Sequence, residues 1–138
     1  MPRILGIDYG RRRLGVAISD ETAMLALPVE TVQVENPAEA VAATVRIARD
    51  RQAQKIVVGL PLNMNGSRGP MAEEVEAFVK LLAEASGLPV ATWDERLSSG
   101  LVERVLLDAD LSRNRRKQVR DKLAAQVILQ GFLDAQAQ

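Results

Sequence analysis

The sequence contains no cysteine and no histidine among its 138 residues. Without cysteine the chain has no disulfide and no thiolate metal site, and without histidine it has no imidazole base and no histidine-bound zinc. A metal ion would therefore be held by oxygen atoms. Oxygen ligands favour Mg²⁺, Mn²⁺ or Ca²⁺.

Aromatic residues and long apolar runs are also scarce. Aromatics make up only 3% of the chain, so platforms on which single-stranded bases could stack are few. Tyr9 and Trp93 are the candidates near the predicted site, and Trp93 suits a core position equally well. The first residues reach Asp8 too soon for a secretory leader, and no apolar run approaches a membrane span. We therefore expect a cytoplasmic protein with no membrane partner.

Net charge of one sign is missing as well, since 18 basic residues balance 18 acidic ones. This balance argues against a protein that coats nucleic acid through its overall charge. Positive charge is instead concentrated in two places, Arg11 to Arg13 and the stretch from Ser112 to Lys122, where Asp121 is the only acid.

The chain has the length of one ordinary domain, and its 47% hydrophobic content is enough for a core. We expect residues 1–138 to form a single domain. Its pattern predicts three strands, a helix, a strand, a helix, a strand and two final helices. The predicted strands cover residues 3–9, 14–20, 27–34, 55–61 and 89–95, and the predicted helices begin at Pro37, Pro70, Ser98 and about Val119, with the basic stretch connecting the last two.

This order predicts an α/β fold with a mixed five-stranded sheet. The first three strands pair as antiparallel hairpins, and helical crossovers make the later strands parallel to the first. The carboxyl ends of the parallel strands then share one edge, where open α/β sheets bind ligands. Asp8, Asp94 and Glu95 fall at this edge, whereas Asp20 ends an antiparallel strand and is expected to be a turn residue at the opposite edge.

A further acid, Asp121, lies on the same helical stripe as Ala125, Ile128 and Phe132. An acid on the buried face of a helix is costly unless something pairs it. The alternative is an acid of the first helical turn, stabilised by the helix dipole. Together with the acids at the strand ends, Asp121 would complete a three-carboxylate cluster, which requires a hard divalent cation.

Four segments carry a family resemblance: "GIDYGRRRLGVAISD", "VVGLPLNMNGSRG", "DERLSS" and "RDKLAAQVILQGFLD". They closely resemble the YqgF/RuvX family, described as Holliday-junction resolvases and as nucleases that mature the 5′ end of pre-16S ribosomal RNA. The resemblance implies a ribonuclease H-like fold and a Mg²⁺- or Mn²⁺-dependent nuclease of structured RNA or branched DNA. It places the catalytic, metal-binding acids at Asp8, Glu95 and Asp121.

The neighbouring acids Asp94 and Glu95 compete for one of these roles. Adjacent strand residues point to opposite faces, so both reach one site only if the strand has already ended. We predict that Glu95 is the ligand, while Asp94 orients Arg96 or caps the following helix. Two divalent ions held by carboxylates can hydrolyse a phosphodiester without a histidine or a nucleophilic side chain.

Substrate contacts are predicted in three places. Each has an ordinary alternative as a solvated turn, a flexible loop or a solvated connection. Glycines in the loop after the fourth strand would let a phosphodiester backbone approach closely. The candidate residues are Arg11, Arg12 and Arg13 in the first turn, Asn63, Asn65, Ser67 and Arg68 in the loop, and Arg115, Arg116 and Lys117 in the basic stretch.

Other functions remain open from the sequence. An ATP-binding module of the actin and sugar-kinase type shares the pattern of an acid, a glycine and a hairpin, but it needs a second domain. A non-catalytic nucleic-acid-binding protein would not need all three acids. Among nucleases, cleavage of a four-way junction calls for a homodimer with two sites, whereas trimming an RNA end needs only a monomer.

Overall fold

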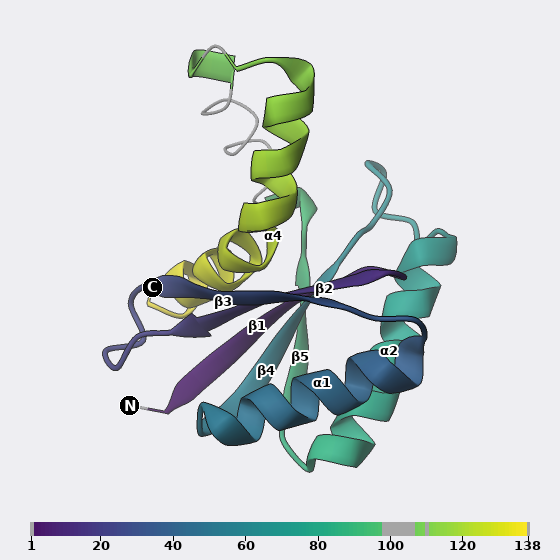
Figure 1. Cartoon of the computed structure of the whole chain (residues 1–138), viewed down its shortest axis with the longest axis vertical. Coiled ribbons are helices and arrows are strands. Elements are labelled where there is room, and N and C mark those ends of the chain that lie inside the picture. Colours follow the sequence, from purple (N-terminus) through teal and green to yellow (C-terminus); the bar gives the residue numbers. More distant parts are fainter. Residues whose placement is uncertain (1, 98–106, 110, 138) are drawn as a thin grey trace.

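The computed structural model describes residues 2–97, 107–109 and 111–137, and the side chains of all of these except 120–122. Five strands and three long helices are described (Figure 1). Their bounds are β1 Arg3–Tyr9, β2 Arg13–Ser19, β3 Ala26–Gln33, α1 Pro37–Asp50, β4 Ala53–Leu60, α2 Pro70–Ser86, β5 Val90–Asp94 and α4 Arg113–Gln136. None of the helices within the described residues is long and apolar enough to cross a membrane.

The sheet has the strand order β3-β2-β1-β4-β5. β1 pairs antiparallel with β2 and parallel with β4, and β5 is parallel to β4. A tight turn makes the first pair antiparallel, with the Gly10 N–H donating to the Arg13 carbonyl at 2.9 Å. The predicted mixed sheet is therefore confirmed, and the ends of β1, β4 and β5 meet at one edge.

Helices cover both faces of the sheet. α1 and α2 pack on one face and α4 crosses the other (Figure 1). The α4 face has glycines where the helix comes closest. A β-carbon on Gly6 would lie 2.6 Å from Leu129 Cβ, and one on Gly59 would lie 2.4 Å from Ile128 Cδ1. Side chains at these two positions would force α4 away from the sheet.

The predicted helix ends agree with the structure for α1 and α2. The Asn36 side chain caps α1 by accepting the Glu39 N–H at 2.9 Å. α2 begins at Pro70 and ends at Ser86, and Gly87, which follows it, adopts the left-handed conformation with φ of 68°. At the opposite edge of the sheet, Asp20 is a turn residue as predicted, since its carboxylate accepts the N–H groups of Met24 and Leu25.

The basic stretch differs from the prediction. It forms the first turns of α4, which begins at Arg113 rather than near Val119. The Ser112 hydroxyl caps it by accepting the Arg115 N–H at 3.2 Å, and the residues that follow favour helix. The helix predicted from Ser98 to about Asp108 falls mostly on residues 98–106, which lie outside the described residues.

Candidate nuclease site

Asp8 lies near the carboxyl end of β1, on the face of the sheet that α4 covers. Its Cβ is 3.5 Å from the point where a β-carbon on Gly15 would sit, and Ala125 Cβ is 3.6 Å from the same point. Asp8 is half-buried. The Asp8 side chain therefore starts at the junction of β1, β2 and α4.

Glu95 follows the last residue of β5. Its backbone N–H donates to the Leu60 carbonyl at 3.1 Å, and its side-chain carboxyl carbon would lie 3.1 Å from a β-carbon on Gly59. The chain has left the strand here, so Glu95 escapes strict alternation and its side chain lies over the α4 face, the same face as Asp8. Gly59 provides the space that the carboxyl group occupies.

The charge state of Glu95 reflects this position. Its pKa is raised from 4.5 to about 7, first because the carboxyl is buried and then because of the negative charges of Asp8 and Asp94. Two carboxylates that repel each other in a partly dry site are suited to share a cation. Perturbed acids at a sheet edge are typical of functional sites.

Asp94 makes a different set of contacts. Its carboxylate accepts the backbone N–H of Arg96 at 3.0 Å and the guanidinium of the same residue at 2.7 to 3.1 Å. These bonds hold the pKa of Asp94 below its usual range. Asp94 therefore orients Arg96, one of the two roles predicted for it, while Glu95 lies near Asp8 and its role as the metal ligand stays a prediction.

The third predicted acid, Asp121, occupies a position on α4 one turn before Ala125, but its side chain lies outside the described ones. Among the described residues no group of three acids gathers in a way that could hold a metal. The donor set itself fits a hard divalent ion, since Asp8 and Glu95 supply oxygen atoms and the repulsion between them calls for a cation.

Arg11 and Arg12 in the first turn are paired with carboxylates. Arg11 binds the Glu74 carboxylate on α2 through two hydrogen bonds of 2.8 Å, and Arg12 lies 3.3 Å from Glu35. Arg11 fastens the turn after Asp8 to α2. A substrate phosphate would have to compete with these carboxylates for either side chain.

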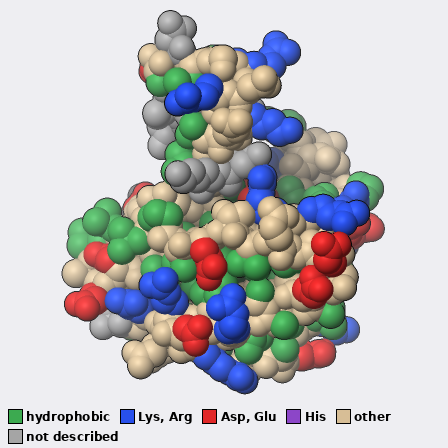
Figure 2. Space-filling model, in the orientation of Figure 1, with side chains coloured by type: hydrophobic (Ala, Val, Ile, Leu, Met, Phe, Trp, Pro, Cys, Tyr) green, Lys and Arg blue, Asp and Glu red, His purple; other side chains and the backbone are tan. Residues whose placement is uncertain are grey.

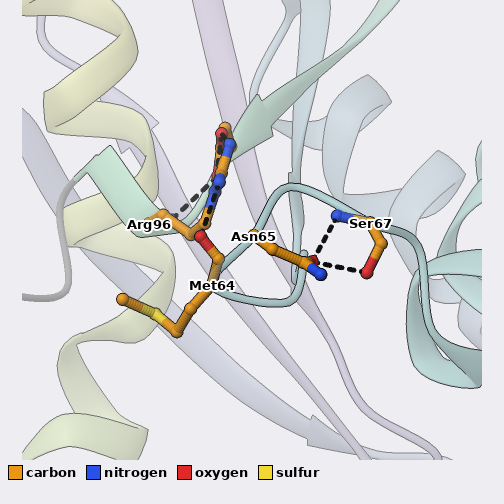
Figure 3. Close-up of polar contacts among 5 residues, drawn as sticks. Met64, Asn65, Ser67 and Arg96 are labelled. Carbon is orange, nitrogen blue, oxygen red and sulfur yellow. Dashed lines mark hydrogen bonds and ion pairs between the residues drawn. The ribbon is translucent and has the colours of Figure 1, made fainter.

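The predicted binding loop between β4 and α2 is closed by its own side chains (Figure 3). Asn65 Oδ1 accepts both the Ser67 N–H, at 3.0 Å, and the Ser67 hydroxyl, at 2.6 Å, and Asn63 Nδ2 donates to the Ser67 hydroxyl at 2.9 Å. Arg68 pairs with Glu76 at 3.1 Å. These contacts close the loop into a folded turn.

The basic residues predicted to bind substrate on α4 lie in the N-terminal half of that helix. The N-terminal half of α4 projects beyond the sheet (Figure 1) and carries Lys and Arg side chains on its surface (Figure 2). Arg115 and Lys117 are exposed, whereas Arg116 is half-buried and donates to the Leu111 carbonyl at 3.1 Å.

The two aromatic candidates are not free stacking platforms. Tyr9 is 8% exposed and stacks on Phe78 with ring centroids 4.3 Å apart. Trp93 is half-buried and meets Phe132 of α4 edge to face. Tyr9 is thus a core residue, contrary to the prediction that it could stack on a base, and Trp93 packs against α4.

A family model described as "RuvX: Holliday junction resolvase" matches residues 2–135. The chain belongs to the RuvX family. A Symbiobacterium thermophilum protein named "Putative pre-16S rRNA nuclease" is 51% identical over 98% of this chain and 94% of its own length. A Pelotomaculum thermopropionicum protein of the same name is 49% identical over 97% and 88%. The sequence resemblance to this family is thereby confirmed.

Solved structures show the same fold. RuvC of Thermus thermophilus in complex with a Holliday junction substrate has a TM-score of 0.65 at 16% identity, covering 99% of this RuvX chain and 96% of RuvC. The fowlpox virus resolvase with Holliday junction DNA has a TM-score of 0.52 at 10% identity, covering 99% of both chains. These likenesses confirm the predicted ribonuclease H-like architecture.

Sequence reasoning missed the partners that fix this RuvX site. Glu74 binds Arg11 from 63 residues away, and nothing local in the sequence signals that pair. Gly59 carried a signal, because a glycine near the end of a buried strand indicates a close approach by another group. The group in question is the Glu95 carboxyl together with Ile128.

Proposed function

We propose that this RuvX protein is a divalent-metal-dependent nuclease that hydrolyses phosphodiester bonds in structured nucleic acid, and that it processes the 5′ end of pre-16S rRNA in the cytoplasm. The observation that carries the proposal is the proximity of Asp8 and Glu95 at the carboxyl edge of the parallel strands. The names of two relatives, which this chain matches over 94% and 88% of their lengths, support the RNA substrate.

Asp8, Glu95 and Asp121 would hold the metal. Bound divalent ions activate water and stabilise the leaving oxygen of a phosphodiester. The secondary structure places these side chains. Asp8 lies on β1, the end of β5 turns Glu95 onto the same face of the sheet, and α4 covers that face. Magnesium and manganese both suit this oxygen donor set.

The substrate backbone would cross the open edge between the loop after β4 and the projecting half of α4. Exposed Arg115 and Lys117 offer charge for flanking phosphates. With Tyr9 in the core, recognition relies on backbone shape and charge more than on base stacking. Arg11 and Arg12 would contribute only after exchanging their carboxylate partners for phosphates.

A second candidate substrate is the four-way DNA junction, favoured by the description of the matched family. Symmetric cleavage of a junction requires two sites related by a two-fold axis, and hence a homodimer. Maturation of an RNA end requires one site on a monomer.

The test is a cleavage assay of the purified protein with Mg²⁺ or Mn²⁺. Three substrates are compared side by side: a four-way junction, a DNA duplex and an RNA with the 16S precursor end. We expect cleavage of the RNA that EDTA abolishes and that is lost in Asp8→Asn, Glu95→Gln and Asp121→Asn, each of which keeps its fold by circular dichroism. Sedimentation velocity gives the oligomeric state. Cleavage of the junction alone, by a dimer, would replace the RNA assignment with the DNA one, and full activity in two of the three variants would refute the metal site.

A further inference from the structure

Arg96 links two parts of the site that are distant in sequence. Its Nε and Nη2 donate to the Asp94 carboxylate at 2.7 to 3.1 Å, and its Nη1 donates to the Met64 carbonyl at 3.2 Å. One side of the guanidinium therefore faces the end of β5, and the other faces the loop after β4 (Figure 3). The Arg96 side chain is only 32% exposed.

The loop curves around this guanidinium. Gly66 has φ of 87°, and a β-carbon there would lie 3.4 Å from Arg96 Nη1. The Gly66 N–H donates to the Asn63 carbonyl at 2.8 Å, and the Asn63 N–H donates to the Ser67 carbonyl at 2.9 Å. These bonds shape the turn internally, whereas the Arg96 contact is what joins the turn to the strand end that carries Glu95.

We propose that Arg96 is a positioning residue that clamps the loop of residues 63–67 to the end of β5, so that the loop meets the substrate backbone at a fixed place relative to Glu95. The inference rests on the proposed nuclease function. It assigns Asp94 a role through Arg96: the carboxylate fixes the guanidinium plane, and the plane fixes the Met64 carbonyl. A bidentate pair of this kind constrains direction as well as distance.

Lysine cannot reproduce this arrangement. An ammonium group is a point charge without the planar fork, so at position 96 it can neutralise Asp94 but cannot also hold the Met64 carbonyl in the same geometry. Arg96→Lys therefore keeps the positive charge at position 96 but loses the hydrogen bonds that hold the loop. Asp94→Asn removes the anion that orients the guanidinium, so its effect on the loop should act through Arg96, although it also removes a negative charge near Glu95.

The first measurement is hydrogen exchange on the substrate-free, metal-free protein. In Arg96→Gln and Arg96→Lys we expect amides in the 63–67 loop to exchange at least about fivefold faster, because local opening of the turn costs less free energy. Peptides from β1 serve as the internal reference. The control variant is Arg46→Gln, an arginine on α1 whose acidic partners, Glu30 and Asp50, lie on the surface at 4.0 and 3.8 Å. It should leave exchange of the loop unchanged.

The second measurement compares binding and cleavage of the precursor RNA. In Arg96→Gln we expect KM and the dissociation constant to rise about tenfold, equivalent to about 1.4 kcal/mol, while kcat changes less than about threefold. Arg96→Lys should recover less than half of the lost affinity. The double variant with Asp94→Asn should bind no worse than Arg96→Gln, because both changes break one clamp.

Unchanged exchange in the loop, a defect confined to kcat, or additive effects of the two changes would each overturn the clamp. If the wild-type protein cleaves none of the substrates, the proposed function fails. Exchange and binding of the RNA then still decide the role of Arg96.

Discussion

Replacing Glu95 with glutamine should change how the stability of the metal-free protein depends on pH. In the folded chain the pKa of Glu95 is about 7, against an ordinary value of 4.5. Between these values the folded state holds more protons than the unfolded state, so the free energy of unfolding falls as pH rises. The stabilisation is fully present below pH 4.5 and is lost as pH passes through about 7.

The size of the effect follows from the same two values. The difference between 4.5 and about 7 corresponds to about 3 kcal/mol, at about 1.4 kcal/mol per pH unit. Because the carboxyl keeps some contact with water, we expect about half of this, or about 1.5 kcal/mol. Glutamine has the same size and no charge, so the variant should gain that amount relative to the wild type at pH 8 and none at pH 4.

The chain is well suited to this measurement because it has no histidine. The other described carboxyl groups with resolved changes, Asp20, Glu74 and Asp94, all have lowered pKa values and titrate in acid. Urea denaturation in EDTA, followed by circular dichroism from pH 4 to pH 8, gives the free energy of unfolding. Parallel curves for the wild type and Glu95→Gln would refute the burial of Glu95 beside Asp8.

Three further predictions concern the helix α4 and its contacts. Gly59→Ala should destabilise the fold by about 1–3 kcal/mol in urea denaturation, because the new methyl group would lie 2.4 Å from Ile128 Cδ1. The control Gly15→Ala, whose methyl group would have neighbours at 3.5 Å or more, should destabilise the fold clearly less. Equal losses of stability would contradict the close approach of α4. Asp121→Asn should raise the melting temperature of the metal-free protein and abolish its increase with Mg²⁺, and an unchanged response to Mg²⁺ would exclude Asp121 as a ligand. Alanine at three basic positions of α4 should weaken RNA binding without sequence preference. The slope of log affinity against log salt should become flatter by up to about one for each phosphate that the variant no longer neutralises. An unchanged slope would place the substrate elsewhere. The substituted residues are Arg115, Arg116 and Lys117.

Much of the fold could be predicted because its determinants are local. Asn36 and Pro37 specify the start of α1, and Gly87 specifies the end of α2. The alternation of strand types follows from short turns and helical crossovers. The place of Asp8 and Glu95 at one edge follows from that topology.

The remaining features depend on partners remote in sequence. No local pattern pairs Arg11 with Glu74 or brings the Met64 carbonyl to Arg96. The start of α4 is difficult to predict because a dense run of positive charge is typical of a solvated connection, while its long unbranched side chains favour helix equally well. The Ser112 cap is the local signal that distinguishes the two.

The position of α4 in the chain affects when the site is completed during synthesis. The five described strands all precede α4 in translation, and its contacts with β1, β2 and β3 join segments about a hundred residues apart. A nascent chain that has passed β5 already contains Asp8 and Glu95, but the face they share is still open to water, and the apolar side chains of Ile4 and Val57 on the same face lack their cover. If the proposed site is correct, we expect it to be complete only after residues 113–136 have left the ribosome, because α4 carries Asp121 and covers this face.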